Sequence, residues 1–341
     1  MDRIDPALLT MFAELDERTA QAALVEGLPL DGSFYRHEVK GRRYWYHRAY
    51  DRAAGKPVAR YVGPSEPKLD ARIERYRELA PMRTERRRMV TLLKRAGFPA
   101  PDAYTGDIIA ALAEAGLFRL RAVLVGTAAY PAYAALLGAR LPSANMMTQD
   151  VDVAQFHGIA LAVGDVSAPI QESLARVDKS FRPVPTLKSP LDCFAYVDAR
   201  GFRVEFLTPH QGSDDQAATL TRLPDLDGPK GQPLRFLDFL IYQEMPTTLL
   251  HGPGVRVNVP APERFTVHKL IIAARRSGAG RLKAAKDLAQ AGALIEAHAA
   301  SRQMDVLHET LEEARARGPA WREALDRSFG RLPPPIRALL P

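Results

Sequence analysis

Two aspartates separated by one residue, Asp150 and Asp152, have the type and spacing best suited to chemistry. Residues 149–153 alternate polar and apolar side chains with the period of a β-strand, so both carboxylates point to one face while Val151 and Val153 point to the other. Neighbouring carboxylates repel each other and are costly to desolvate unless a cation lies between them. The pattern therefore predicts a metal site, and the alternative is a solvent-facing strand whose aspartates pair with arginines.

A second strand is expected to supply a third carboxylate. In residues 202–208 the aromatic and aliphatic side chains alternate, which leaves Glu205 on the opposite face together with Arg203. Asp192 and Asp198 are rivals, although residues 198–201 are typical of the hairpin turn that leads into this strand. Oxygen ligands of this number suit Mg²⁺ or Mn²⁺.

The elements around these strands can also be predicted. Residues 121–125 read as a short buried strand that runs into a turn at Gly126 and Thr127, and residues 128–137 read as a helix. Further strands are expected at 234–242 and 255–259, and helices at 107–115, from 262 onward, at 283–299 and at 304–329. The helix that begins at Pro262 carries Lys269, and the next carries Lys286 and Asp287.

The N-terminal third differs from the rest in composition. The chain has 341 residues and a net charge of +7, but residues 29–95 alone carry an excess of ten positive charges, which leaves the remainder at −3. A helix is expected at 6–26, a three-stranded antiparallel meander at 32–64, and a charged helix at 66–96 with a break at Pro81. Seven of the 26 aromatic residues lie between Phe34 and Tyr61, interleaved with Lys and Arg. Such a mixture fits an RNA-binding platform at residues 32–63, or equally a small sheet with its own aromatic core.

These patterns predict an α+β protein in three parts: 1–97, 98–260 and 261–341. Several other classes are excluded. The single cysteine, Cys193, permits neither an internal disulfide nor a thiolate metal site, and the eight histidines lack ligand spacing. Neither a phosphate-binding Gly-x-x-x-x-Gly-Lys motif nor a Gly-x-Ser-x-Gly elbow is present. Because no stretch is apolar enough to span a bilayer, we expect a cytoplasmic protein that does not bind membranes.

Together, the turn at Gly126 and Thr127, the following helix, the Asp150/Asp152 strand and the Glu205 strand resemble the polymerase-β-like nucleotidyltransferase superfamily. Residues 265–270 and 286–288 look like the helical tail of the minimal nucleotidyltransferases related to abortive-infection and toxin–antitoxin proteins. The resemblance covers roughly residues 100–300 and implies a nucleotidyltransferase-fold mixed sheet flanked by helices. Two features depart from the pattern: Thr127 replaces the usual Gly or Ser, and the interval from Gly126 to Asp150 is long.

The resemblance implies transfer of an NMP from an NTP to a hydroxyl group. Asp150, Asp152 and Glu205 would bind the metals, and Gly126 and Thr127 would hold the triphosphate. Lys269 and Lys286 are further candidates for the nucleotide site: Lys269 could reach a phosphate, and Lys286 or Asp287 could brace the pocket. The basic N-terminal part suggests RNA, such as tRNA, as acceptor, with a toxin-like role and an antitoxin as partner. A small molecule or a protein side chain is the alternative acceptor, and an inactive scaffold that binds nucleic acid is the alternative function. For Lys269 and Lys286, a snorkelling lysine and a helix-surface ion pair are equally compatible with the sequence.

Overall fold

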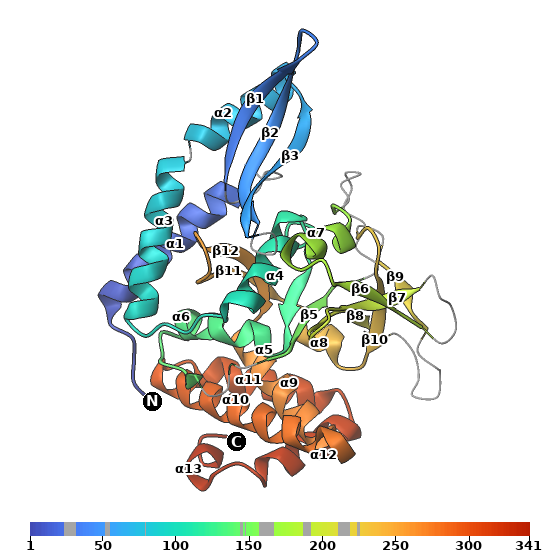
Figure 1. Ribbon diagram of the computed structural model, residues 1–341. Coiled ribbons are helices and arrows are strands. Elements are labelled where there is room, and N and C mark those ends of the chain that lie inside the picture. Colours follow the sequence, from blue (N-terminus) through green and yellow to red (C-terminus); the bar gives the residue numbers. More distant parts are fainter. Residues whose placement is uncertain are drawn as a thin grey trace.

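The computed structural model describes residues 1–23, 32–51, 55–78, 80–143, 146, 148–156, 167–186, 192–210, 219–223 and 226–341. It combines helices with three sheets, which confirms the predicted α+β class (Figure 1). Within the described residues, no helix is both long and apolar enough to cross a membrane. The meander lies at one end of the molecule and the C-terminal helices at the other (Figure 1).

The N-terminal elements agree closely with the expectation. Helix α1 (Pro6–Ala23) is followed by strands β1 (Ser33–Val39), β2 (Arg42–Asp51) and β3 (Lys56–Pro64), which pair antiparallel in that order. The predicted charged helix is divided into α2 (Pro67–Glu78) and α3 (Ala80–Arg95), because the ring of Pro81 cannot continue a helix without disrupting the preceding turn. The predicted end of the first helix, at residues 24–26, lies outside the described residues.

The central sheet is mixed and contains the two acidic strands. Its order is β4 (Val123–Val125), β5 (Asp150–Ala154), β8 (Arg203–Pro209), β10 (Lys230–Leu234) and β9 (Thr221–Arg222). Strand β7 (Cys193–Val197) pairs with the first half of β8 and with β6 (Arg182–Pro185), so β8 is central. Strand β5 is parallel to β8 and antiparallel to β4.

Helices and a separate hairpin surround this sheet. Helix α4 (Ala103–Glu114) begins four residues before the predicted start, because the Asp102 carboxylate caps it by accepting the Tyr104 and Thr105 amides. After β4 the chain forms α5 (Gly126–Ala129), a 3₁₀ turn (Tyr130–Ala132) and α6 (Tyr133–Leu137), where one helix was expected. Helix α7 (Ile170–Val177) and the hairpin of β11 (Glu244–Leu249) and β12 (Val255–Pro260) complete this part.

Two further expectations are wrong in part. The predicted strand at 234–242 is instead the end of β10 followed by helix α8 (Leu237–Leu240), reached through the left-handed residue Phe236. An apolar run of this length fits a buried strand or a buried helix, so periodicity could not distinguish them. The predicted helix at 304–329 is two helices, because Gly318 and Pro319 interrupt it.

The C-terminal region is helical, as expected. It consists of α9 (Pro262–Arg275), a 3₁₀ turn (Gly278–Gly280), α10 (Arg281–Ala300), α11 (Met304–Ala316), α12 (Pro319–Phe329) and α13 (Pro334–Arg337). These helices share a hydrophobic core that includes Val267, Leu270 and Leu311. A larger core joins the central sheet to α4 and also contains Phe12 of α1 and Leu93 of α3. The meander and α2 have a small core of their own, formed by Phe34, Trp45 and Ile73.

Candidate active site

The alternation predicted for β5 is present in the structure. Val151 and Val153 are 0% and 1% exposed in the main core, whereas Asp150 and Asp152 lie partly buried on the opposite face of the strand. The two aspartates share that face because their side chains are two residues apart on extended backbone. The strand therefore presents two carboxylates side by side between β4 and β8 of the mixed sheet.

Glu205 lies directly beside this pair. In the parallel register of β5 and β8, Asp152 is the partner of Glu205 and Asp150 is the partner of Arg203. Partners in a sheet point to the same side, so three carboxylates and one guanidinium occupy one face. The rival aspartates are engaged elsewhere: Asp192 pairs with Lys230 at 2.7 Å, and Asp198 accepts hydrogen bonds from the Tyr104 hydroxyl and the Phe202 amide.

Gly126 closes over the Asp152 carboxylate. Its φ is +66°, and a Cβ atom at this position would lie 2.4 Å from Oδ2 of Asp152. Only glycine combines this left-handed conformation with such a close approach without strain. Thr127, the next residue, is half-buried in the first turn of α5. The strand β4 thus delivers the glycine turn to the carboxylate, since Val125 is the antiparallel partner of Asp152.

Electrostatics differ sharply between the two aspartates. Burial, together with the charges of Asp150 and Glu205, raises the pKa of Asp152 to about 7. Burial would also raise the pKa of Asp150, but hydrogen bonds from Thr148 and Lys283 and the charges of Lys283 and Lys286 outweigh it and lower that pKa. The carboxylate cluster therefore has an excess of negative charge centred on Asp152, which a bound cation would relieve.

Two cationic side chains already contact the cluster. Lys283 Nζ donates a hydrogen bond to Asp150 Oδ2 at 3.1 Å, and Arg203 Nε lies 2.8 Å from Glu205 Oε1. The Thr148 hydroxyl donates to the other oxygen of Asp150. Of these, Lys283 was not predicted to belong to the site. A signal was available, because Lys283 and Lys286 are three residues apart and so lie on the same face of α10.

The predicted lysines have different environments. Lys269 on α9 is buried and donates to Asp287 Oδ1 at 2.7 Å, while Arg276 Nε lies 2.5 Å from the other oxygen of Asp287. The positive charge of Lys269 also favours the ionised form of Asp152, and so partly offsets the rise in the pKa of that carboxyl group. Lys286 is half-buried, and this burial, with the charge of Lys269, lowers its pKa. Lys269 is thus neither snorkelling nor part of a surface pair, since both members of its ion pair are buried.

The donor set fits a magnesium ion, although the carboxylates do not form a closed cage. In the described parts of the chain, no three Asp, Glu, His or Cys side chains are close enough to hold a metal as they stand. Mg²⁺ keeps several water ligands and is usually bound by one or two carboxylates together with substrate phosphates, so a closed cage is not required. On metal binding, the ion would replace Lys283 at Asp150 and Arg203 at Glu205.

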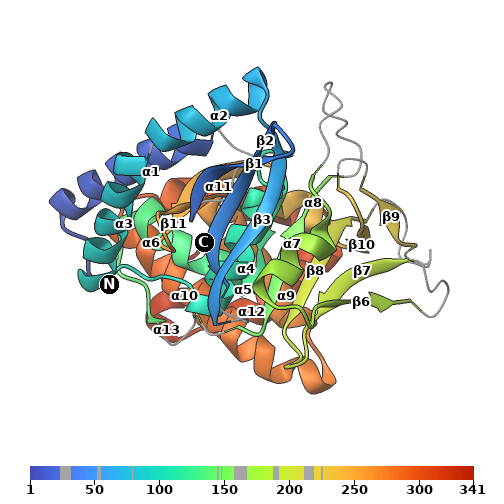
Figure 2. The same cartoon turned by 45° about the horizontal axis from the view of Figure 1, so that its top comes forward.

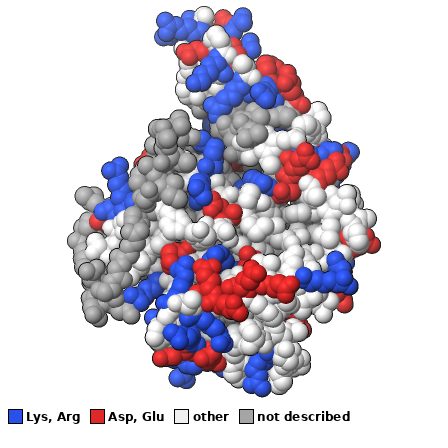
Figure 3. All heavy atoms as spheres, turned by 180° about the vertical axis from the view of Figure 1, so that it is seen from behind, with Lys and Arg blue, Asp and Glu red and all other residues white. Residues whose placement is uncertain are grey.

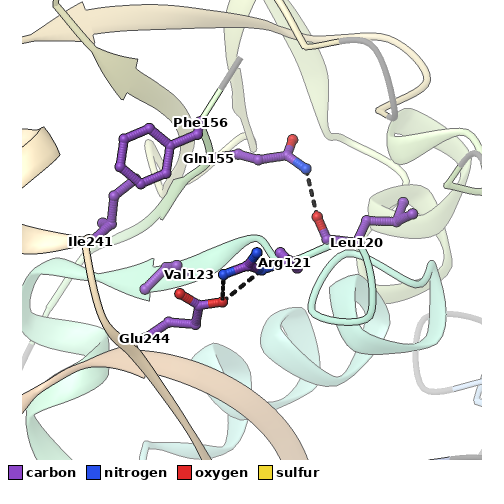
Figure 4. Close-up of a pocket in the computed structure, with 7 residues that line it drawn as sticks. All are labelled: Leu120, Arg121, Val123, Gln155, Phe156, Ile241 and Glu244. Carbon is purple, nitrogen blue, oxygen red and sulfur yellow. Dashed lines mark hydrogen bonds and ion pairs between the residues drawn. The ribbon is translucent and has the colours of Figure 1, made fainter. Parts of the chain in front are cut away.

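A separate pocket lies at the far end of β4. It is lined by residues of β4 and β11 and by Gln155 and Phe156, which follow β5 (Figure 4). Gln155 Nε2 donates to the Leu120 carbonyl at 2.6 Å, and Arg121 and Glu244 form an ion pair within it (Figure 4). None of the predicted site residues lines this pocket. This pocket is therefore distinct from the carboxylate face of β5 and β8.

Comparisons with known proteins identify the class. Residues 103–316 match the family described as Nucleotidyltransferase, and the chain belongs to this family. The match spans α4 to α11 and so includes both acidic strands and the lysine-bearing helices. It supports a nucleotidyltransferase enzyme, a class that generally uses an NTP and a divalent metal.

Other comparisons add little. A crystal structure of an antigenic nucleotidyltransferase-like protein from Paracoccidioides brasiliensis is similar at 17% identity, over 67% of this chain and 94% of that chain, with a TM-score of 0.31. A likeness this weak carries no argument about function. No curated protein matches the chain.

Proposed function

We propose that the protein transfers an NMP from an NTP to a hydroxyl group with Mg²⁺ or Mn²⁺ bound at Asp150, Asp152 and Glu205. The observation that carries this proposal is the register of β5 and β8, which pairs Asp152 with Glu205. In addition, Gly126 lies against the carboxylate of Asp152. When bound, the metal would neutralise charge on the phosphates and on the attacking oxygen. The protein's own contribution is mainly positioning and electrostatic stabilisation.

The surrounding residues have roles consistent with this reaction. Gly126 leaves the backbone open beside Asp152, and with Thr127 it would contact the triphosphate. Lys283 and Lys286, on one face of α10, supply positive charge beside Asp150. Lys269, held by Asp287, supplies a further positive charge that acts on Asp152. We assign these lysines to neutralising phosphate charge, because a carboxylate cluster alone would repel an NTP.

RNA, including tRNA, is the acceptor that we propose. The basic N-terminal part supports this choice, since Lys and Arg gather over the end of the molecule formed by the meander and α2 (Figure 3). A toxin-like role with an antitoxin as protein partner would be the biological setting for such an activity. It predicts that induced expression halts growth and that expression of an Asp150→Ala/Asp152→Ala variant does not.

The direct test is incorporation of labelled NTP into bulk RNA with Mg²⁺. We expect incorporation by the wild-type protein and none by Asp150→Ala/Asp152→Ala, with each of the four NTPs assayed separately. An Asp192→Ala variant is the matched control, because that carboxylate pairs with Lys230 away from the cluster. If wild type and double variant bind RNA with equal salt dependence and neither incorporates label, the protein is a nucleic-acid-binding scaffold without this activity.

A further inference from the structure

The two faces of the meander have different environments. Phe34 of β1 and Trp45 of β2 point toward α2 and form the small core with Ile73 of that helix. The other face is turned away from α2, and in Figure 2 the three strands lie in front of the rest of the molecule. The aromatic residues of 32–63 therefore lie on both faces of the sheet. Phe34 and Trp45 are in the core on the α2 side, whereas most of the tyrosines lie on the outer face.

Three of these tyrosines form a row across all three strands. Tyr35 is the partner of Tyr46 in the β1–β2 register, and Tyr46 is the partner of Tyr61 in the β2–β3 register. The Tyr35 and Tyr46 ring centroids are 5.8 Å apart with nearly parallel planes, and those of Tyr46 and Tyr61 are 5.7 Å apart edge to face. Tyr35 is 38% exposed and Tyr61 is 58% exposed. The row is accessible and does not contribute to any of the three hydrophobic cores.

The charged side chains described on this face are all positive. By the same alternation, Arg42 and Arg48 of β2 lie on the tyrosine face, and both are exposed. Among the described residues of the meander, no Asp or Glu shares it, since Glu38 is the partner of Arg43 and lies on the α2 side. Exposed aromatic rings can stack on planar bases, and the arginines can pair with phosphate groups. The face therefore has the features of a surface that binds single-stranded nucleic acid.

We infer that Tyr35, Tyr46 and Tyr61 form a stacking surface for unpaired bases of RNA, whose phosphates contact Arg42 and Arg48. Bases in a duplex are already stacked on each other, so only single-stranded RNA can offer their faces to the rings. The inference rests on the proposed RNA acceptor and narrows it to a single-stranded segment. It concerns binding alone and can therefore be tested without the transfer reaction.

The test measures binding of a labelled single-stranded RNA of about 12 nucleotides, a length within the range of known platforms, to the full chain by fluorescence anisotropy. We expect Tyr35→Ala/Tyr61→Ala to weaken binding by about thirtyfold or more, because the variant removes two of the three rings on which bases would stack. The salt dependence should stay unchanged in that variant. Arg42→Gln/Arg48→Gln should instead lower the slope by roughly 1.4, which corresponds to two phosphate contacts.

Two control variants distinguish base stacking on the meander from a general effect of losing a tyrosine and from the transfer reaction. Tyr242→Ala removes a tyrosine that is 61% exposed outside the meander and should leave RNA affinity unchanged. Asp150→Ala/Asp152→Ala should also bind RNA normally, so a failed transfer assay does not affect the result. Equal affinity for duplex and single-stranded RNA, or no effect of the tyrosine substitutions, would overturn the inference. So would a dimer that Tyr35→Ala/Tyr61→Ala converts to a monomer in sedimentation, because the face would then bind a second copy.

Discussion

Asp152 on β5 and Glu205 on β8 are direct partners in a parallel pair of strands, and Arg203 is the partner of Asp150 one step away on the same face. This arrangement places a guanidinium within the carboxylate cluster itself. Arg203 lies 2.8 Å from Glu205, and Lys283 lies 3.1 Å from Asp150, so two of the three carboxylates have a side-chain cation. Asp152 is the carboxylate whose excess charge remains least compensated, as its raised pKa indicates.

Replacing Gly126 should disrupt the site selectively. In Gly126→Ala the new Cβ would overlap Asp152 Oδ2, and the left-handed backbone would add about 1–2 kcal/mol of strain. We expect nucleotidyl transfer to fall at least about a hundredfold, because small misplacements of a reacting group have effects of this size. The matched control is Gly252→Ala, which has a φ of +55° and no neighbour within 4 Å. It should lose only the stability that the backbone strain costs, and it should keep its activity; equal activity losses in both variants would contradict the assigned contact.

Removing the charge of Asp152 should stabilise the metal-free protein. The folded-state pKa is raised from 3.8 to about 7, so ionising this group above pH 7 costs free energy that the unfolded chain does not incur. Asp152→Asn should therefore increase the free energy of unfolding at pH 8 by on the order of 4 kcal/mol. The gain should shrink as the pH falls through 7 and vanish below 3.8, where both states are protonated. Urea unfolding in EDTA at several pH values measures it, and a constant difference at all pH values would contradict the origin of the effect.

Removing Lys283 should strengthen metal binding in the absence of nucleotide. Its ammonium group competes with a metal ion for Asp150, but the side chain is 64% exposed, so screening limits the effect. We expect Lys283→Met to bind Mn²⁺ a few-fold to about tenfold more tightly by calorimetry, which corresponds to roughly 1 kcal/mol. Arg281→Met removes the same formal charge from an exposed position on α10 and should leave the affinity unchanged. Weaker Mn²⁺ binding by Lys283→Met would contradict the competition.

The buried pair of Lys269 and Asp287 should show strong coupling. Asp287→Leu leaves Lys269 buried without its partner, and we expect a loss of about 3–5 kcal/mol in the free energy of unfolding. Lys269→Met should cost less, because Arg276 still pairs with Asp287. The double variant should be more stable than the sum of the single effects predicts. Urea denaturation of all four proteins completes the cycle, and additive effects would show that the two groups do not support each other.

The sequence was sufficient where local periodicity determines the structure. Alternation alone predicted that Asp150 and Asp152 share one face, and it placed Glu205 opposite Val204 and Phe206 on the second acidic strand. That the two strands are neighbours followed from the family resemblance, because strand pairing is a tertiary property. The turn at Gly126 and the helices α9 and α10 were also found, since glycine and proline mark their limits.

The remainder depends on contacts between distant residues. Lys283 reaches Asp150 from 133 residues away, and no local pattern indicates that contact. Helix α8 was predicted as a strand because its apolar residues pack against two cores at once, which removes the polar face that distinguishes a surface helix. Likewise, the sequence could not show that the tyrosines lie on one face of the meander and Phe34 and Trp45 on the other, because this depends on the strand register and on the position of α2.

The meander and α2 lie in the chain between α1 and α3, two helices that pack on the core of the central sheet. Phe12 of α1 and Leu93 of α3 belong to the core of the central sheet, and the Ile4 amide donates to the Gly138 carbonyl, whereas β1–β3 have only their small core with α2. The strands are thus inserted between two helices that the catalytic body needs. Deleting residues 1–97 would expose the main core, while replacing only 33–78 by a short linker would spare α1 and α3. The chain is therefore organised as a domain with an insertion, and we expect the inserted segment to tolerate exchange while α1 and α3 stay in place.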